Sequence, residues 1–130
     1  MANEIQALNP CPCCGNLVFA DPPGSAMSCP VCGWEDDYVQ LLWPTESEGA
    51  NRFSLEESQS EFSRHGSSDP QRRPRSALSN GTFARDAGWR PFDRSRDGAE
   101  PPADLRAESE LSDLDQLYYW RRTMGSTRLR

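Results

Sequence analysis

The chain has 130 residues, which is enough for one small domain, and its formal net charge is −6 at pH 7. Valine, isoleucine, leucine and phenylalanine together number 20 residues, fewer than a large hydrophobic core requires. This composition excludes a large α/β enzyme scaffold. It also indicates that the five cysteines help to hold the fold together.

The sequence contains no apolar segment near the ~20 residues of a membrane-spanning helix, so we expect no membrane partner. Its first ten residues, MANEIQALNP, have neither the basic start nor the apolar stretch of a secretory signal. We therefore expect a cytoplasmic protein. Disulfides are rare in the cytoplasm, where clustered cysteines more often bind a metal ion.

Charge is unevenly divided along the chain. Residues 1–66 carry ten acidic residues and two arginines, whereas residues 67–130 carry ten acidic residues and twelve arginines. The acidic first part repels phosphate groups, which makes nucleic acid the less favoured partner. It favours another protein with a basic surface.

Two copies of the pattern C-P-x-C-G contain all five cysteines, and we name them the first knuckle (11–15) and the second knuckle (29–33). Between them lie an apolar strand candidate at 17–19, a turn at 21–25 and a returning strand candidate at 26–28. The sequence therefore predicts a zinc ribbon, with the knuckles on a β-hairpin. A C-x₂-C pair directs both sulfurs to one side, so two pairs can surround one tetrahedral metal ion.

We predict one structural zinc ion, with Cys11, Cys14, Cys29 and Cys32 as its ligands. Four sulfur ligands leave no open position for water or substrate, so the site is structural and not catalytic. The same four ligands can hold iron, which the sequence does not exclude. Cys13 is left over, and we interpret it as a small packed residue, with a redox-active thiol as the alternative.

The segment after the second knuckle mixes aromatic, acidic and leucine residues up to Pro44. Acidic and aromatic side chains together are candidates for a surface that binds a basic partner. The candidates here are Trp34, Glu35, Asp36, Asp37 and Tyr38.

A helix is predicted next, because Ser54 and Glu57 have the spacing of a capping box and Gly66 can end the helix in a left-handed conformation. Its apolar face is small and needs the preceding aromatic segment as a docking surface. His65, the single histidine, lies at its end, where it interacts with the helix dipole; a catalytic base is the alternative.

Residues 67–102 are rich in arginine, serine, proline and glycine, and their isolated aromatics favour an irregular wrap over a free linker. Residues 103–122 have the apolar spacing of an amphipathic helix, with an acidic start and a basic end. Tyr119 and Trp120, near the end of that helix, are two further partner-binding candidates.

We therefore expect two parts that pack as one compact unit. Residues 1–66 form a zinc ribbon with a capping helix, and residues 67–130 form an arginine-rich irregular wrap and a C-terminal amphipathic helix that packs on the ribbon. The fold class is a small metal-stapled α+β fold, a zinc ribbon followed by two helices with a long irregular connection.

Three sequence strings resemble the cysteine-rich CPCC family of small bacterial proteins: CPCCG at 11–15, PPGS at 22–25 and CPVCGWEDD at 29–37. The resemblance continues through Gln40 and Gly49-Ala50-Asn51 and covers roughly residues 9–70. It implies a zinc-binding domain and supports the four-cysteine ligand set. It implies no particular activity.

The function that we predict is a non-catalytic, zinc-stabilised module that binds another protein, in a specific form a bacterial immunity protein that neutralises a toxin. The alternative is a nucleic-acid-associated zinc ribbon, a transcription or translation accessory, that uses the arginine-rich stretch at 72–96. A third hypothesis is a redox or hydrolytic enzyme that uses Cys13 or His65.

Overall fold

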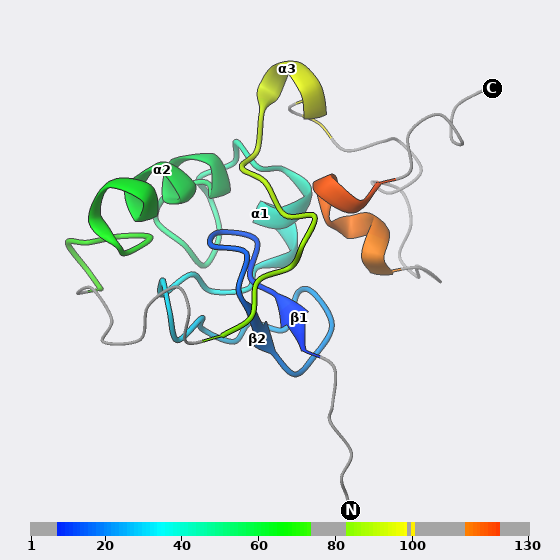
Figure 1. The fold of residues 1–130 in the computed structure, drawn as a ribbon. Helices are drawn as coiled ribbons and strands as arrows, with labels where there is room; N and C mark the ends of the chain where they lie inside the picture. The colour runs from blue at the N-terminus through cyan, green and yellow to red at the C-terminus, as the bar shows by residue number, and fades with distance from the viewer. Residues whose placement is uncertain (1–7, 74–82, 99, 101–113, 123–130) are drawn as a thin grey trace, which may run out of the picture.

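The structure is a computed structural model, and it describes residues 8–73, 83–98, 100 and 114–122. In these residues the chain forms two short strands, three helices and two 3₁₀ segments (Figure 1). In chain order these are β1 (Asn9–Pro10), β2 (Leu17–Phe19), α1 (Tyr38–Leu42), α2 (Leu55–His65), α3 (Arg94–Asp97), η1 (Leu114–Leu117) and η2 (Tyr119–Arg121). No helix within the described ranges is both long and apolar enough to cross a lipid bilayer.

Strand β2 is where the sequence predicts a strand, but its predicted partner is wrong. It pairs antiparallel with β1, so that Asn9 lies opposite Phe19 and Pro10 opposite Leu17. The segment at 26–28 pairs instead with the chain that follows the second knuckle, through a bridge between Ser28 and Glu35.

The reason for this pairing is that each knuckle is itself the turn of a hairpin. The backbone N–H of Cys11 donates to the Asn16 carbonyl at 2.9 Å, and the N–H of Cys29 donates to the Trp34 carbonyl at 2.8 Å. The chain therefore folds back across each cysteine pair separately. The two hairpins then meet through their sulfurs. The single predicted hairpin, in which residues 17–19 would pair with residues 26–28, does not form.

The buried core gathers around the knuckles and includes all five cysteines. Its largest fully buried side chains include Phe19, Trp34, Leu55, Leu117 and Tyr118. These side chains come from segments far apart in the sequence. Together, the few apolar residues of the chain pack into one cluster around the cysteines.

Helix α2 has the predicted capping at both ends. The Ser54 hydroxyl accepts from the Glu57 N–H at 3.1 Å, and the Glu57 carboxylate accepts from the Ser54 N–H at 2.9 Å. Gly66 ends the helix at φ 79°. Leu55 is fully buried and Phe62 packs against the core, so the predicted apolar face does dock.

Residues 83–93 are irregular and run across the first hairpin (Figure 1). The Leu17 N–H donates to the Ala84 carbonyl, and the Asp86 N–H donates to the Gly15 carbonyl, both at 2.8 Å. These bonds use backbone groups of β2 and of the first knuckle that the short β1 leaves unpaired.

The predicted helix over 103–122 is wrong in its described part, and its residues 103–113 lie outside the described ranges. Residues 114–121 form the two 3₁₀ segments, which are separated at Tyr118 by an extended backbone at φ −83° and ψ 119°. A continuous helix could not turn three consecutive aromatic residues toward the core. The break allows Tyr118 and Tyr119 both to be buried.

Candidate metal centre

Both knuckles have the same backbone geometry. The N–H of the closing glycine donates to the carbonyl of the first cysteine, from Gly15 to Cys11 at 2.7 Å and from Gly33 to Cys29 at 2.9 Å. The two glycines have φ of 83° and 90°, in the left-handed region that residues with a side chain rarely adopt. The tight turn brings both sulfurs of each C-x₂-C pair to one side.

The sulfurs of Cys11, Cys14, Cys29 and Cys32 lie within 4.8 Å of one another, and all four residues are buried. The Sγ atoms of Cys11 and Cys32 are 3.6 Å apart, and those of Cys14 and Cys29 are 3.7 Å apart. A disulfide would need about 2.05 Å. A tetrahedral metal ion with bonds of about 2.3 Å would place its sulfurs about 3.8 Å apart. The four cysteines are therefore positioned to hold a metal ion.

Hydrogen bonds to individual sulfurs stabilise the negatively charged thiolate form. The backbone N–H groups of Val31 and Cys32 point at the Cys29 sulfur at 3.3 and 3.5 Å. The Asn16 side-chain amide donates to the Cys14 sulfur at 3.0 Å. Such outer contacts orient ligands and stabilise the thiolate form that binds a metal.

The electrostatics of the cluster also favour a bound cation. Burial raises the pKa of the Cys11 and Cys32 thiols well above its ordinary value. Hydrogen bonds from the neighbouring thiols, that of Cys11 first, lower the pKa of Cys14. Protons therefore stabilise a buried cluster that cannot carry four negative charges alone, and a divalent metal ion can replace those protons.

The model of the cysteine-rich CPCC family matches residues 9–79, which is more than half of the chain and includes both knuckles. This chain belongs to the cysteine-rich CPCC family. A comparison with curated proteins finds none that matches it. In this CPCC protein the segments at 83–98 and 114–122 lie beyond the matched region.

Two polar residues of the CPCC protein fix the chain that follows the second knuckle. The Asn51 side chain bonds both the N–H and the carbonyl of Glu35, at 2.9 and 2.8 Å. Gln40, fully buried, bonds the Asn51 backbone at its N–H and its carbonyl, at 3.0 and 3.1 Å. A Cβ on Gly49 would lie 2.7 Å from the Gln40 side chain, so only glycine fits at this approach.

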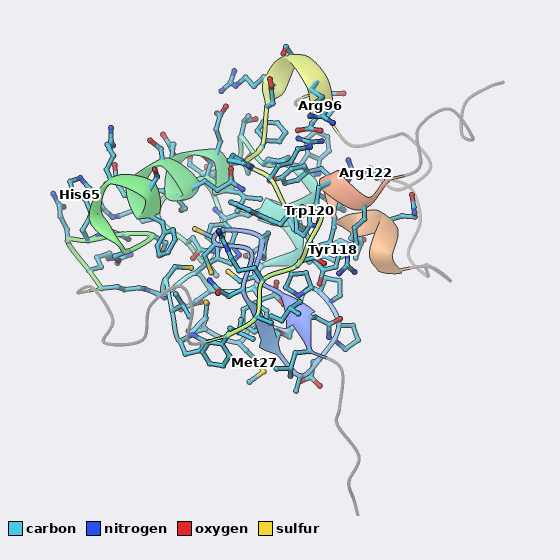
Figure 2. All side chains as sticks on the ribbon, in the orientation of Figure 1. Met27, His65, Arg96, Tyr118, Trp120 and Arg122 are labelled. Carbon is cyan, nitrogen blue, oxygen red and sulfur yellow. The ribbon has the colours of Figure 1, made fainter. Side chains whose placement is uncertain are left out.

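Cys13 of the CPCC protein is not one of the four clustered sulfurs, and it is 1% exposed. Burial raises the pKa of its thiol, and a hydrogen bond with Cys32 opposes this effect. His65 lies at the exposed end of α2, with Nε2 3.8 Å from a Glu61 oxygen (Figure 2).

Three residues far from the first knuckle in sequence, Gln59, Trp89 and Tyr119, form a clamp on it that the sequence did not predict. The Pro12 carbonyl accepts from the Gln59 side-chain amide and from the Trp89 indole N–H, both at 2.9 Å. Gln59 also donates to the Tyr119 hydroxyl at 2.9 Å, and Trp89 packs so closely on Gly15 that a Cβ there would lie 2.8 Å from its ring. A glutamine on the docked helix face and a lone tryptophan in a polar segment were the available signals.

The second knuckle has a different cover. The Ser68 N–H donates to the Cys32 carbonyl at 2.8 Å. The Arg73 side chain lies over Gly33, where a Cβ would be 2.8 Å from its Cδ, and its guanidinium pairs with Glu35 at 2.9 Å. An arginine here has the place that Trp89 has on the first knuckle.

Three of the partner-binding candidates are not surface residues. Trp34 is 0% exposed, Asp36 is 1% exposed and Tyr119 is 4% exposed, which corrects their assignment to a contact surface. Asp36 instead holds the turn before the second knuckle, because its Oδ2 accepts from the N–H groups of Gly24 and Ser25 at 3.1 and 3.0 Å.

The remaining candidates are accessible to different degrees. Glu35 is partly exposed and pairs with Arg73, while Asp37 caps α1 by accepting from the Gln40 N–H at 3.0 Å. Tyr38 is 38% exposed, and Trp120 is partly exposed (Figure 2). Two exposed residues that the sequence analysis did not single out are Met27, 45% exposed, and Val39, 49% exposed.

Proposed function

We propose that this CPCC protein is a non-catalytic module, stabilised by zinc, that binds another protein. The observation that carries the proposal is the closed sulfur site. Its four ligand residues are between 0% and 3% exposed, so a four-coordinate metal ion among them has no open position for water or substrate. A metal held in this way contributes to folding, because the unfolded chain has no preformed site.

We assign zinc because Zn²⁺ prefers a tetrahedron of four thiolates and has no redox chemistry that the site would have to control. Iron has the same ligand preference in this geometry. Elemental analysis and absorption spectroscopy separate the two, because a zinc site is colourless and a tetrathiolate iron site is not. One zinc ion per chain is the expected result, and stoichiometric iron contradicts the assignment.

Exposed apolar side chains beside the second knuckle support a protein partner. Tyr38 packs on Gly24, where a Cβ would lie 3.2 Å from the tyrosine Cβ. The Met27 carbonyl accepts from the Asp36 N–H at 2.9 Å, so this loop runs beside the start of α1. Met27, Tyr38 and Val39, which we name the α1 patch, are thus exposed in the acidic part of the chain. A partner with apolar contacts and a basic rim fits it.

The first experiment is native mass spectrometry on protein purified gently from its own host. One zinc ion and a co-purifying basic protein are expected. Val39→Ser should reduce recovery of that protein, whereas Leu8→Ser, which changes an exposed leucine before β1, should not. A chain that retains zinc but recovers nucleic acid in place of protein contradicts the proposal.

Neutralisation of a bacterial toxin is the specific form of the proposal, and it rests on the small size and acidity of the chain and on its family. Co-expression with a toxin encoded beside it tests this form. Protection is expected with the wild type and should weaken with Val39→Ser. Unchanged toxicity contradicts the immunity role and leaves the protein-binding module to be judged by the first experiment.

The nucleic-acid alternative has less support, since most described arginines of the 72–96 stretch have partners within the chain. Ion pairs join Arg73 to Glu35, Arg90 to Asp97 and Arg94 to Glu56. Arg85 donates to the Cys14 carbonyl and lies over the Trp89 ring. Binding to nucleic acid that weakens steeply with salt would revive this alternative.

A further inference from the structure

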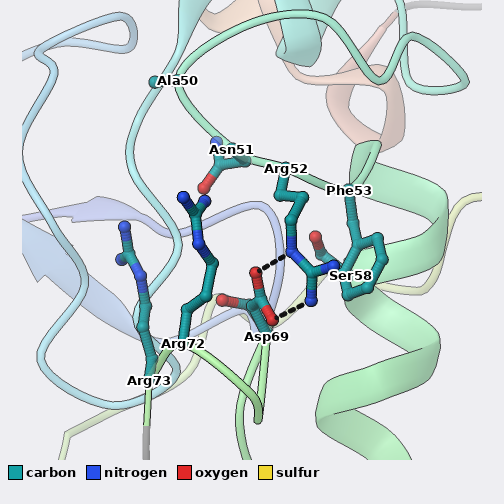
Figure 3. Close-up of a pocket in the computed structure, with 9 residues that line it drawn as sticks. Ala50, Asn51, Arg52, Phe53, Ser58, Asp69, Arg72 and Arg73 are labelled. Atoms are coloured by element: carbon teal, nitrogen blue, oxygen red, sulfur yellow. Dashed lines mark hydrogen bonds and ion pairs between the residues drawn. The ribbon is translucent and has the colours of Figure 1, made fainter.

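A narrow cleft beside the second knuckle lies between the chain at 50–53, helix α2 and the chain at 68–73 (Figure 3). Its cavity of about 10 Å³ admits a single oxygen-sized group. Three arginines and two serines are among its lining residues: Arg52, Arg72, Arg73, Ser58 and Ser68. None of these residues is one of the four clustered cysteines or belongs to the α1 patch, although Ser68 and Arg73 also cover the second knuckle.

The two serine hydroxyls are the first observation that points to a ligand. Ser58 is 1% exposed and Ser68 is 2% exposed, and both line the cleft. Neither hydroxyl makes a hydrogen bond to any residue that the structure describes, and neither oxygen is fully enclosed by the protein. Both hydroxyls are therefore available as donors to a group that enters the cleft.

The charge of the cleft is the second observation. Arg52 makes a bidentate pair with Asp69, at 2.7 and 3.0 Å, and this pairing lowers the pKa of the Asp69 carboxyl and neutralises its charge. Arg73 pairs with Glu35 at 2.9 Å. Arg72 makes no ion pair within the described ranges, so three guanidinium groups face two carboxylates and leave one positive charge.

We infer that this cleft binds a single phosphoryl group, with one oxygen between the two serine hydroxyls and the others on Arg72 and Arg73. The donors come from separate segments and from different directions, which suits a tetrahedral oxyanion better than a planar carboxylate. The acidic first part of the chain disfavours a polyanion, so the group is that of a small molecule. Arg52 keeps Asp69 neutralised, and it stacks on Phe53 at 4.4 Å, which holds it in place.

The test is calorimetric titration of the metal-loaded full chain with inorganic phosphate at low ionic strength, alongside acetate. Arg72→Ala should weaken phosphate binding about tenfold or more, because it removes a charged hydrogen-bond donor. Arg96→Ala is the matched control, since Arg96 is also exposed, makes no ion pair among the described residues and changes the net charge equally. It should alter the dissociation constant less than about twofold.

A second pair of variants tests the hydroxyls. Ser58→Ala should weaken phosphate binding several-fold, whereas Ser63→Ala, at an exposed position of the same helix, should leave it unchanged. No phosphate binding at millimolar concentration, equal losses in Arg72→Ala and Arg96→Ala, or acetate binding as tight as that of phosphate would each overturn the inference. These results do not depend on the protein partner proposed above.

Discussion

The two knuckles have the same sequence pattern and the same backbone turn, but different structures cover them. Trp89, Gln59 and Tyr119 secure the first knuckle. Ser68 and Arg73, which follow α2 directly, cover the second. The first knuckle therefore depends on an aromatic clamp and the second on a charged side chain.

The difference between the two covers coincides with the end of the family match at residue 79. The cover of the second knuckle lies within residues 9–79, whereas Trp89 and Tyr119 lie beyond them. A C-P-x-C-G turn determines its own sulfur geometry through local hydrogen bonds. It does not determine what packs on its outer face, so the same turn can be covered in two chemically different ways.

The largest effect should come from removing a shared metal ligand. Cys29→Ser should abolish metal binding and unfold both hairpins, because structural zinc sites contribute about 10 kcal/mol or more in small domains. Cys13→Ser changes a buried thiol outside the cluster and should cost about 1–3 kcal/mol. Metal stoichiometry and thermal unfolding measure both effects. Equal loss of metal in the two variants would contradict the ligand assignment.

The next effect separates the knuckles directly. Gly15→Ala and Gly33→Ala both force a side chain into positive φ, at a cost of about 1 kcal/mol each. The new Cβ at Gly15 also lies 2.8 Å from the rigid Trp89 ring, whereas the one at Gly33 meets the flexible Arg73 side chain. Gly15→Ala should therefore lose about 3 kcal/mol of unfolding free energy and Gly33→Ala about 1–2 kcal/mol. Equal losses in urea unfolding would show that the two covers are equally adaptable.

What the sequence predicts well is what is local in the chain. The cysteine spacing predicts the sulfur cluster, and Ser54, Glu57 and Gly66 predict both ends of α2, because each pattern needs only neighbouring residues. The strand pairing was mistaken because each knuckle closes its own hairpin through backbone bonds that leave no mark on composition.

Contacts that join distant parts of the chain could not be predicted. Gln59 and Trp89 meet the Pro12 carbonyl from 47 and 77 residues away. Acidic residues after the second knuckle suggested an outer surface, yet Asp36 is buried because the N–H groups of the preceding turn provide its hydrogen bonds. Without knowledge of those donors, burial of a carboxylate is not expected from sequence.

The two covers themselves can be compared by truncation. Trp89→Ala removes a partly buried indole and one hydrogen bond to the first knuckle, and should cost about 2–3 kcal/mol. Arg73→Ala removes a partly exposed ion pair and should cost about 1 kcal/mol or less. Urea unfolding of the metal-loaded proteins measures the difference. A larger loss for Arg73→Ala would reverse the proposed order of the two covers.

The smallest expected effect concerns the carboxylate of Asp86, which accepts hydrogen bonds from Trp120 and Arg121, the two residues that follow the clamp residue Tyr119. Burial of Asp86 opposes its ionisation, but hydrogen bonds from Arg121 and Trp120, at 3.0 and 2.6 Å, outweigh burial and lower the pKa of this carboxyl. Its stabilising contribution is therefore present at neutral pH, decreases as the pH falls toward the ordinary aspartate pKa of about 4, and is lost below the lowered folded-state value.

Asp86→Asn should cost about 1 kcal/mol at pH 7, and its difference from the wild type should narrow as the pH falls below about 5. Acid also weakens metal binding to thiolates, so the difference between the two proteins is the quantity to measure. Asp69→Asn is the matching variant near the second knuckle, because the Asp69 carboxylate pairs with Arg52 there. If the Asp86→Asn difference stayed constant as the pH fell, the ionised Asp86 would not be what fastens the aromatic clamp to the first knuckle.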